Sequence, residues 1–237
     1  MRVAVIPARG GSKRIPRKNV LPFAGKPMMA HSIDRALESG LFDRVIVSTD
    51  DDEIAGIALA RGAEVPFRRP AALADDHATT LDVMQHAIGW LRSAGFEPDS
   101  VCCIYATAPF ISCGDLRQAL EKLVSGDWSY VFAATTFPYP VFRSFQLEPG
   151  DGLRMLFPQH ALTRSQDLPT VLHDAGQFYW GRPQAWFERV GIFGARSAVV
   201  QIPSWRVQDI DTAEDWERAE LIARLLDTQP IESDRAI

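Results

Sequence analysis

The chain has 237 residues, of which 46% are hydrophobic and 23% charged, and its formal net charge is −5. This acidic balance argues against general binding to nucleic acid or to an anionic membrane, because both need a basic protein surface. No apolar run approaches the roughly 18 residues of a membrane-spanning helix, and the first residues enter a strand without a signal-peptide pattern. We therefore expect a cytoplasmic protein with no nucleic-acid and no membrane partner.

A basic loop follows the first predicted strand. Residues 2–6 form a largely apolar run, typical of a central parallel strand, and residues 6–19 then read IPARGGSKRIPRKN. Gly10 and Gly11 can adopt positive φ and leave backbone N–H groups open to oxygen ligands. The basic loop is therefore predicted to hold a polyphosphate. Five cations within ten residues supply the charge, namely Arg9, Lys13, Arg14, Arg17 and Lys18.

Helical and strand patterns alternate after this loop. Apolar residues recur at helical spacing from residue 28 to 37, and residues 45–49 read as the second strand. The acidic run at 50–53 is predicted to cap the next helix, with metal binding as the less favoured interpretation. Residues 63–67 are predicted to form a short strand.

The alternation continues through the middle of the chain and predicts a doubly wound, mostly parallel sheet. Helices are expected at 80–91 and 116–123, and strands at 101–105 and 128–135. The adjacent cysteines Cys102 and Cys103 show no metal-ligand spacing and are expected to pack in the buried strand. Ligands of such sheets bind beyond the carboxyl ends of the strands. The basic loop, Arg69 and the loop at 105–109 should therefore meet at one crevice.

The pattern changes at about residues 137–176 to prolines, aromatics and short alternating segments. We interpret this stretch as a hairpin arm inserted in a single catalytic domain, serving as a homodimer contact, a lid or a small satellite core. Strands at 177–180 and 198–202 and a helix at 212–226 complete the prediction. The tail from about 228 to 237 is expected to fray.

A pair of carboxylates precedes the last helix. If residues 205–211 are extended, Asp209 and Asp211 face the same side while Ile210 points into the core. Mg²⁺ is usually held by one or two carboxylates together with phosphate oxygens and water. The alternative is that Asp211 stabilises the helix start and Asp209 is merely solvated. Together with the basic loop, the pair indicates a nucleoside triphosphate and metal site.

Other phosphate and nucleophile motifs are absent from the sequence. There is no GxxxxGK[ST], no GxGxxG after the first strand and no Ser, His and Asp grouping typical of acyl transfer. These absences disfavour a P-loop NTPase, a dinucleotide dehydrogenase and a serine hydrolase.

Six segments between Arg2 and about Leu226 resemble the acylneuraminate cytidylyltransferase family: IPARGGSKRIPRKN, VSTDDDEIA, RRPAALADD, TRSQDL, HDAGQFYWG and QDIDTAEDW. The resemblance implies a Rossmann-like sheet of the nucleotide-diphospho-sugar transferase type with a dimerising arm. It also implies Mg²⁺-dependent transfer of CMP from CTP to the anomeric hydroxyl of a nine-carbon 2-keto sugar acid, with release of pyrophosphate. CIYATAPF and HDAGQFYW are similar to the pseudaminic acid branch. Sialic acid enzymes typically carry QPTSP at 105–109, and arginine and asparagine in place of His173 and Ala175.

The resemblance also implies roles for individual residues. Catalysis is assigned to Lys18, Arg9 and Asp211, and metal binding to Asp209 and Asp211. Contacts to CTP are assigned to Arg9, Gly10, Gly11, Ser12, Lys13, Asn19, Arg69 and Thr107. Contacts to the sugar, some of them from a neighbouring subunit, are assigned to Tyr105, Arg164, Gln166, His173, Asp174, Gln177, Phe178 and Tyr179.

The sequence leaves three alternative functions to consider. The same reaction could use N-acetylneuraminate or legionaminate. The chain could instead be a non-catalytic CTP-binding regulator that retains the basic loop. A nucleic-acid-binding arm is disfavoured, because the basic loop lacks interleaved aromatics and the rest of the chain is acidic.

Overall fold

The structure, a computed structural model, describes residues 1–228; the predicted frayed tail therefore lies almost entirely outside the described residues. Its centre is a six-stranded sheet with the order β10-β6-β9-β5-β1-β4. The strands of this sheet are β1 (Arg2–Pro7), β4 (Arg44–Ser48), β5 (Ser100–Ile104), β6 (Tyr130–Thr136), β9 (Leu172–Gly181) and β10 (Ser197–Gln201). The helices are α1 (Met28–Glu38), α2 (Asp52–Ala60), α3 (Thr80–Ser93), α4 (Cys113–Ser125), α5 (Pro183–Phe187) and α6 (Ala213–Thr228).

Five strands of the sheet run in one direction. β1 pairs in parallel with β4 and β5, and β10 pairs in parallel with β6. β9 lies between β5 and β6 and is antiparallel to both. The predicted doubly wound, mostly parallel α/β fold is therefore confirmed.

Helices cover both faces of the sheet, as βα alternation requires. On one face α1, α2 and α4 bury residues such as Ile33, Ile54 and Leu116 against the sheet. On the other face α3 and α5 do the same with Met84 and Trp186. Cys102 and Cys103 are fully buried, one in each of these two clusters, as expected.

Side-chain caps account for where two helices begin. Asp51 caps α2 by accepting from the Ile54 N–H at 3.0 Å, which confirms the capping interpretation of the acidic run. Thr79 and Asp82 form a reciprocal capping box at the start of α3.

Two expectations about secondary structure were wrong, and one short hairpin was not predicted. Residues 63–67 are not a strand: Glu64 forms one isolated bridge with Ile46 of β4, and Pro66 has no N–H to continue a ladder. β9 begins at Leu172 rather than at 177, so its first residues belong to the sheet and not to the arm. The short strands β2 (Pro22–Phe23) and β3 (Lys26–Pro27) form a tight hairpin that the sequence reading missed.

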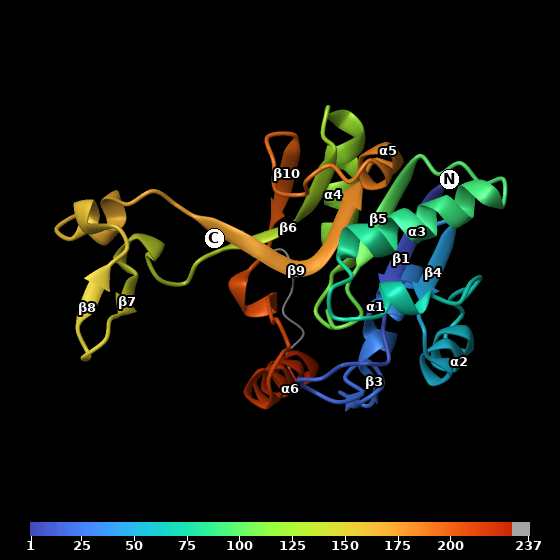
Figure 1. Cartoon of the computed structure of the whole chain (residues 1–237), viewed down its shortest axis with the longest axis horizontal. Coiled ribbons are helices and arrows are strands. Elements are labelled where there is room, and N and C mark those ends of the chain that lie inside the picture. Colours follow the sequence, from blue (N-terminus) through green and yellow to red (C-terminus); the bar gives the residue numbers. More distant parts are fainter. Residues whose placement is uncertain (229–237) are drawn as a thin grey trace.

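The inserted segment projects from the body as an arm (Figure 1). It carries the two-stranded hairpin of β7 (Phe145–Leu147) and β8 (Leu153–Met155) and leads from β6 into β9. The predicted hairpin is therefore present, although the arm ends at residue 171 rather than at 176.

A third cluster lies beside the sheet and joins the two ends of the chain. Phe23 and Met28 pack there with Ile210 from the segment before α6 and with Ala219 and Ala223 of α6. This cluster holds the segment around Ile210 next to the basic loop. No helix among residues 1–228 is long and apolar enough to cross a membrane.

Candidate active site

The basic loop leaves β1 at the carboxyl end of the strand and is tied to the loop before α3. Arg9 donates to the Asp75 carbonyl at 2.6 Å and lies 2.9 Å from the Asp76 carboxylate. Lys13 contacts the same carboxylate. The Asn19 amide donates to the Arg9 carbonyl at 2.9 Å, which holds the end of the loop against its beginning. Two cations thus converge on one anionic group.

The two glycines of the loop act differently from the prediction. Neither has positive φ, so that expectation was wrong. The Gly10 N–H is not open to a ligand, because it donates to Asp50 Oδ1 at 3.1 Å. A Cβ at Gly10 would lie 2.6 Å from Asp51 Oδ2 and 3.0 Å from Asp51 Cβ, whereas a Cβ at Gly11 would meet nothing within 4 Å. Gly10 is needed for close approach of the acidic run.

Arg17, rather than a glycine, carries the unusual backbone conformation in this loop. Its φ is 59°, which is unfavourable for a side chain of this kind. Its guanidinium contacts the carboxylates of Asp51 and Glu53. The hydrogen bond from Arg17 lowers the pKa of Asp51 to about 2. Arg17 therefore anchors the loop to the start of α2 and fixes the residue that follows it, Lys18.

The acidic pair lies opposite the basic loop. The Lys18 ammonium is 3.1 Å from Asp211 Oδ1 and also donates to the Ile210 carbonyl. Arg14 lies 2.7 Å from the other oxygen of Asp211. The segment is not extended throughout, because residues 205–206 belong to a short helical turn, but Ile210 is fully buried as predicted. Desolvation by the surrounding protein raises the pKa of the Asp209 carboxyl, and the negative charge of Asp211 adds to this effect.

A cavity of about 220 Å³ separates the basic loop from the loops after β5 and before α3. The convergence of three loops on one crevice is therefore present. The predicted residues that line it are Arg9, Ser12, Lys18, Asn19, Arg69, Tyr105 and Thr107. Lining residues that the sequence did not predict include Ala78, Thr79, Thr80 and Val83. The acidic pair at 75–76 was the available signal that the loop before α3 faces the cations.

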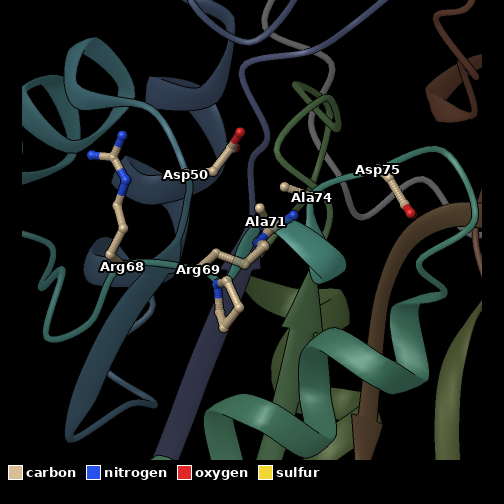
Figure 2. A pocket seen from close by; sticks show the side chains of 7 residues that line it. Asp50, Arg68, Arg69, Ala71, Ala74 and Asp75 are labelled. Carbon is tan, nitrogen blue, oxygen red and sulfur yellow. The ribbon is translucent and has the colours of Figure 1, made fainter.

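Arg69 lies in this cavity and in a second one of about 630 Å³ beside it, shown in Figure 2. Only 5% of Arg69 is exposed, and its Nε donates to the Ser48 hydroxyl at 3.1 Å. Burial lowers the pKa of Arg69 to about 10, so the guanidinium remains charged at neutral pH. The neighbouring Arg68 extends to the other side of the loop and pairs with Asp52.

Aromatic hydroxyls and a carboxylate line the boundary between β5 and β9. Tyr179 donates to Asp174 Oδ2 at 2.5 Å, and its ring centroid lies 5.3 Å from that of Tyr105. The Tyr105 hydroxyl is 3.1 Å from the Thr80 hydroxyl of α3. Burial raises the pKa of Tyr179, which keeps it a neutral donor. His173 precedes Asp174 on β9, and its ring lies tilted against that of Phe137 at the base of the arm, with 4.7 Å between the centroids.

The remaining residues predicted to contact the sugar are either buried or located on the arm. Phe178 is fully buried in the core cluster to which α1, α2 and α4 contribute, a position that favours packing over contact with a sugar. Gln177 is also buried, and its amide nitrogen donates to the Arg206 carbonyl at 2.6 Å. Arg164 and Gln166 belong to the arm, and within one chain they stand apart from the crevice.

The acidic pair fits Mg²⁺ in donor chemistry. Across residues 1–228 no group of three or more His, Cys, Asp and Glu side chains is arranged to hold a metal ion. Mg²⁺, however, commonly takes only one or two protein carboxylates and completes its shell with substrate phosphates and water. Asp209 and Asp211 supply such oxygens on either side of the buried Ile210.

Two solved structures share the fold of this chain. The chain is similar to CMP:2-keto-3-deoxy-manno-octonic acid synthetase complexed with CTP, with a TM-score of 0.67 at 19% identity, covering 96% of this chain and 99% of that one. It is also similar to 4-diphosphocytidyl-2C-methyl-D-erythritol synthase from Anaerococcus prevotii, with a TM-score of 0.64 at 13% identity over 94% and 98% of the chains. At these identities the likeness establishes the fold.

The sequence comparisons are more specific. Residues 3–229 match the family described as cytidylyltransferase, and the chain belongs to that family. It is 46% identical to a pseudaminic acid cytidylyltransferase of Campylobacter jejuni, over 94% of this chain and 96% of that protein. A bifunctional Helicobacter pylori protein, pseudaminic acid cytidylyltransferase and UDP-2,4-diacetamido-2,4,6-trideoxy-beta-L-altropyranose hydrolase, is 40% identical over 88% of this chain and 40% of its own length. N-acylneuraminate cytidylyltransferase B of Danio rerio is 34% identical over 92% of this chain and 50% of that protein.

The two glycines of the basic loop offer a matched test of this geometry. Gly10→Ala should weaken CTP binding by about tenfold or more, because the added methyl group pushes Asp51 away and so releases the anchor of Arg17. Gly11→Ala should bind CTP like the parent, since its Cβ enters open space. Isothermal titration calorimetry measures both. Equal affinities for the two variants would contradict the anchoring role of the acidic run.

Proposed function

We propose that the protein transfers CMP from CTP to the anomeric hydroxyl of pseudaminic acid and releases pyrophosphate. The observation that carries the proposal is the contact between Asp211 and Lys18, a residue that lines the crevice together with Arg9, Ser12 and Arg69. Similarity to the Campylobacter protein over nearly the whole of both chains supports the choice of sugar.

The basic loop would neutralise the departing pyrophosphate. Arg9 and Lys13 already share one carboxylate, that of Asp76, so a phosphate group can bridge the same two cations. Charge accumulates on pyrophosphate as the bond to the α-phosphorus breaks, and fixed cations are worth most where charge develops. The Asn19 side-chain amide holds Arg9 in place by donating to the Arg9 backbone carbonyl.

Arg69 would read the cytosine. Ser48 engages its Nε and, through the backbone carbonyl, one terminal nitrogen, which leaves other donors of the planar guanidinium toward the cavity. Cytosine presents acceptors at O2 and N3, which such donors match. Thr107 and the Ala78 to Thr80 stretch line the same cavity and would limit the size of the base.

Lys18 would stabilise the α-phosphoryl group during attack. Its side chain is only 16% exposed and is held by Asp211 and the Ile210 carbonyl, so little reorganisation is needed when charge develops. Asp209 and Asp211 would hold Mg²⁺ beside it. A bound Mg²⁺ would supply positive charge that polarises phosphate oxygens and favours ionisation of a nearby hydroxyl.

The sugar acid would enter at the edge formed by β5 and β9. Asp174 and Tyr179 form a hydrogen-bonded pair there, and Tyr105 and His173 stand beside it. These groups offer both donors and acceptors for amides and hydroxyls. His173 and Ala175 occupy positions where sialic acid enzymes carry arginine and asparagine, which favours a differently substituted sugar.

The choice of sugar is tested by pyrophosphate release with CTP and each of three sugar acids. We expect turnover with pseudaminate to exceed that with N-acetylneuraminate and legionaminate by at least tenfold in kcat/KM. Equal or faster turnover with either of the other sugars would remove the substrate assignment. Tight CTP binding without turnover on any of the three would favour the regulator instead.

Replacement of Lys18 tests the role of the ammonium group. In Lys18→Ala, kcat should fall by about 10²- to 10³-fold while the KM for CTP changes little, because the contact is strongest in the transition state. Steady-state kinetics with saturating sugar give both constants. Lys122→Ala, on the exposed surface of α4, serves as the control and should retain the parent kcat. A variant whose KM rises with kcat unchanged would show ground-state binding instead.

We also propose that the arm pairs two copies of the chain. Its large apolar side chains are unusually exposed, with Leu162 at 98%, Tyr139 at 82% and Leu147 at 77%. Exposed apolar patches of this kind mark interaction surfaces. A second copy seated on the arm would also give Arg164 and Gln166 a crevice to reach, that of the partner.

The arm contact is tested by light scattering coupled to size-exclusion chromatography. The parent should elute with twice the mass of one chain, and Leu147→Glu should shift toward a single chain. Leu59→Glu, at a 60% exposed position on α2, should leave the mass unchanged. A parent that is already a single chain at micromolar concentration would refute the pairing.

A further inference from the structure

The segment that carries the two carboxylates has little regular structure of its own. It runs from the short helical turn Ser204–Arg206 to the start of α6, and residues 207–211 lie between these elements without helix or strand. An unbraced stretch of this kind would leave carboxylates free to spread apart. Two devices at its carboxyl end oppose this: the burial of Ile210, and the Thr212 hydroxyl and Asp215 carboxylate, which cap α6 reciprocally.

The amino end of the segment is held by Arg206. Two guanidinium nitrogens of Arg206 donate to the two carboxylate oxygens of Asp115. The distance from Nη2 to Oδ1 is 3.3 Å. The two side chains are 16% and 15% exposed, so the pair is largely withdrawn from solvent. A forked contact of this kind fixes direction as well as distance.

Both partners of Arg206 belong to rigid elements. Asp115 lies in the first turn of α4, where the Ser112 hydroxyl accepts from the N–H groups of Gly114 and Asp115. On the other side, the buried Gln177 of β9 donates to the Arg206 carbonyl at 2.6 Å. Arg206 thus ties the segment to a helix through its side chain and to the sheet through its backbone.

A largely buried ion pair is weak evidence for stability, because the cost of removing two charges from water can exceed their attraction. Its better use is to select one geometry. Arg206 precedes Asp209 by three residues and Asp211 by five, so a shift at Arg206 carries to both carboxylates.

We propose that Arg206 and Asp115 are positioning residues for the metal-holding pair Asp209 and Asp211. This inference rests on the proposed function, and it assigns to the ion pair the task of keeping the two carboxylates facing Lys18. Neither residue touches the cavity that would hold CTP. Disturbing them should therefore weaken the metal contribution to nucleotide binding without weakening nucleotide binding itself.

The test compares CTP affinity in Mg²⁺ with CTP affinity in EDTA, measured by titration calorimetry without sugar acid. The parent should bind CTP more tightly in Mg²⁺. The double variant Arg206→Met/Asp115→Leu replaces the buried pair by apolar groups, an exchange that often preserves folding. It should keep the parent affinity in EDTA and lose about tenfold or more of the tightening by Mg²⁺, as is common when residues that orient metal ligands are removed.

A matched control uses an exposed ion pair. Arg196 and Asp127 lie 2.9 Å apart with side chains 62% and 92% exposed. The double variant Arg196→Met/Asp127→Leu should leave the Mg²⁺ effect at the parent value. Melting temperatures and circular dichroism identify the folded variants.

If the buried double variant does not fold, Arg206→Lys takes its place. Lysine keeps the charge but loses the fork, so the Mg²⁺ effect should fall part of the way. Parent-like tightening by Mg²⁺ in a folded Arg206 variant would overturn the proposal. Pyrophosphate release by a parent whose CTP affinity ignores Mg²⁺ would also overturn it, while leaving the transferase function intact.

Discussion

The site depends on a contact between residues 193 positions apart, the Lys18 ammonium and the Asp211 carboxylate, which lie 3.1 Å from each other. The contact exists because both ends of the chain pack into one cluster, where Ile210 lies with Phe23 and Met28. The basic loop follows β1 at the carboxyl edge of the sheet. The packing of Ile210 with α6 in the cluster holds the acidic pair at the same edge. Without this cluster the basic loop would not meet the acidic pair.

Charge in the crevice is balanced locally, which explains how an acidic chain can carry a concentrated basic loop. All five cations of the loop contact carboxylates: Arg9 and Lys13 share Asp76, Arg14 and Lys18 share Asp211, and Arg17 pairs with Asp51 and Glu53. The Arg17 contacts hold the loop's shape. Of the other four cations, Arg9 and Lys18 line the cavity proposed for the triphosphate.

The local parts of this site could be predicted from the sequence, because they follow from spacing. Ile210 is buried between two aspartates as period-two alternation requires, and Asp51 caps α2 as its position suggested. Contacts made by tertiary approach could not be predicted. Gly10 is required by the nearness of Asp51 rather than by its own φ, and the positive φ falls on Arg17. The ion pair of Arg206 and Asp115 joins residues 91 positions apart, and no sequence pattern in either segment predicts it.

The most direct test of the account is a crystal structure with a non-hydrolysable CTP analogue and Mn²⁺, a metal that can be located by its anomalous scattering. The account predicts an anomalous peak between the α-phosphate and the carboxylates of Asp209 and Asp211, with the Lys18 ammonium within hydrogen-bonding distance of an α-phosphate oxygen. A triphosphate bound away from the basic loop, or a metal ligated without either aspartate, would contradict it.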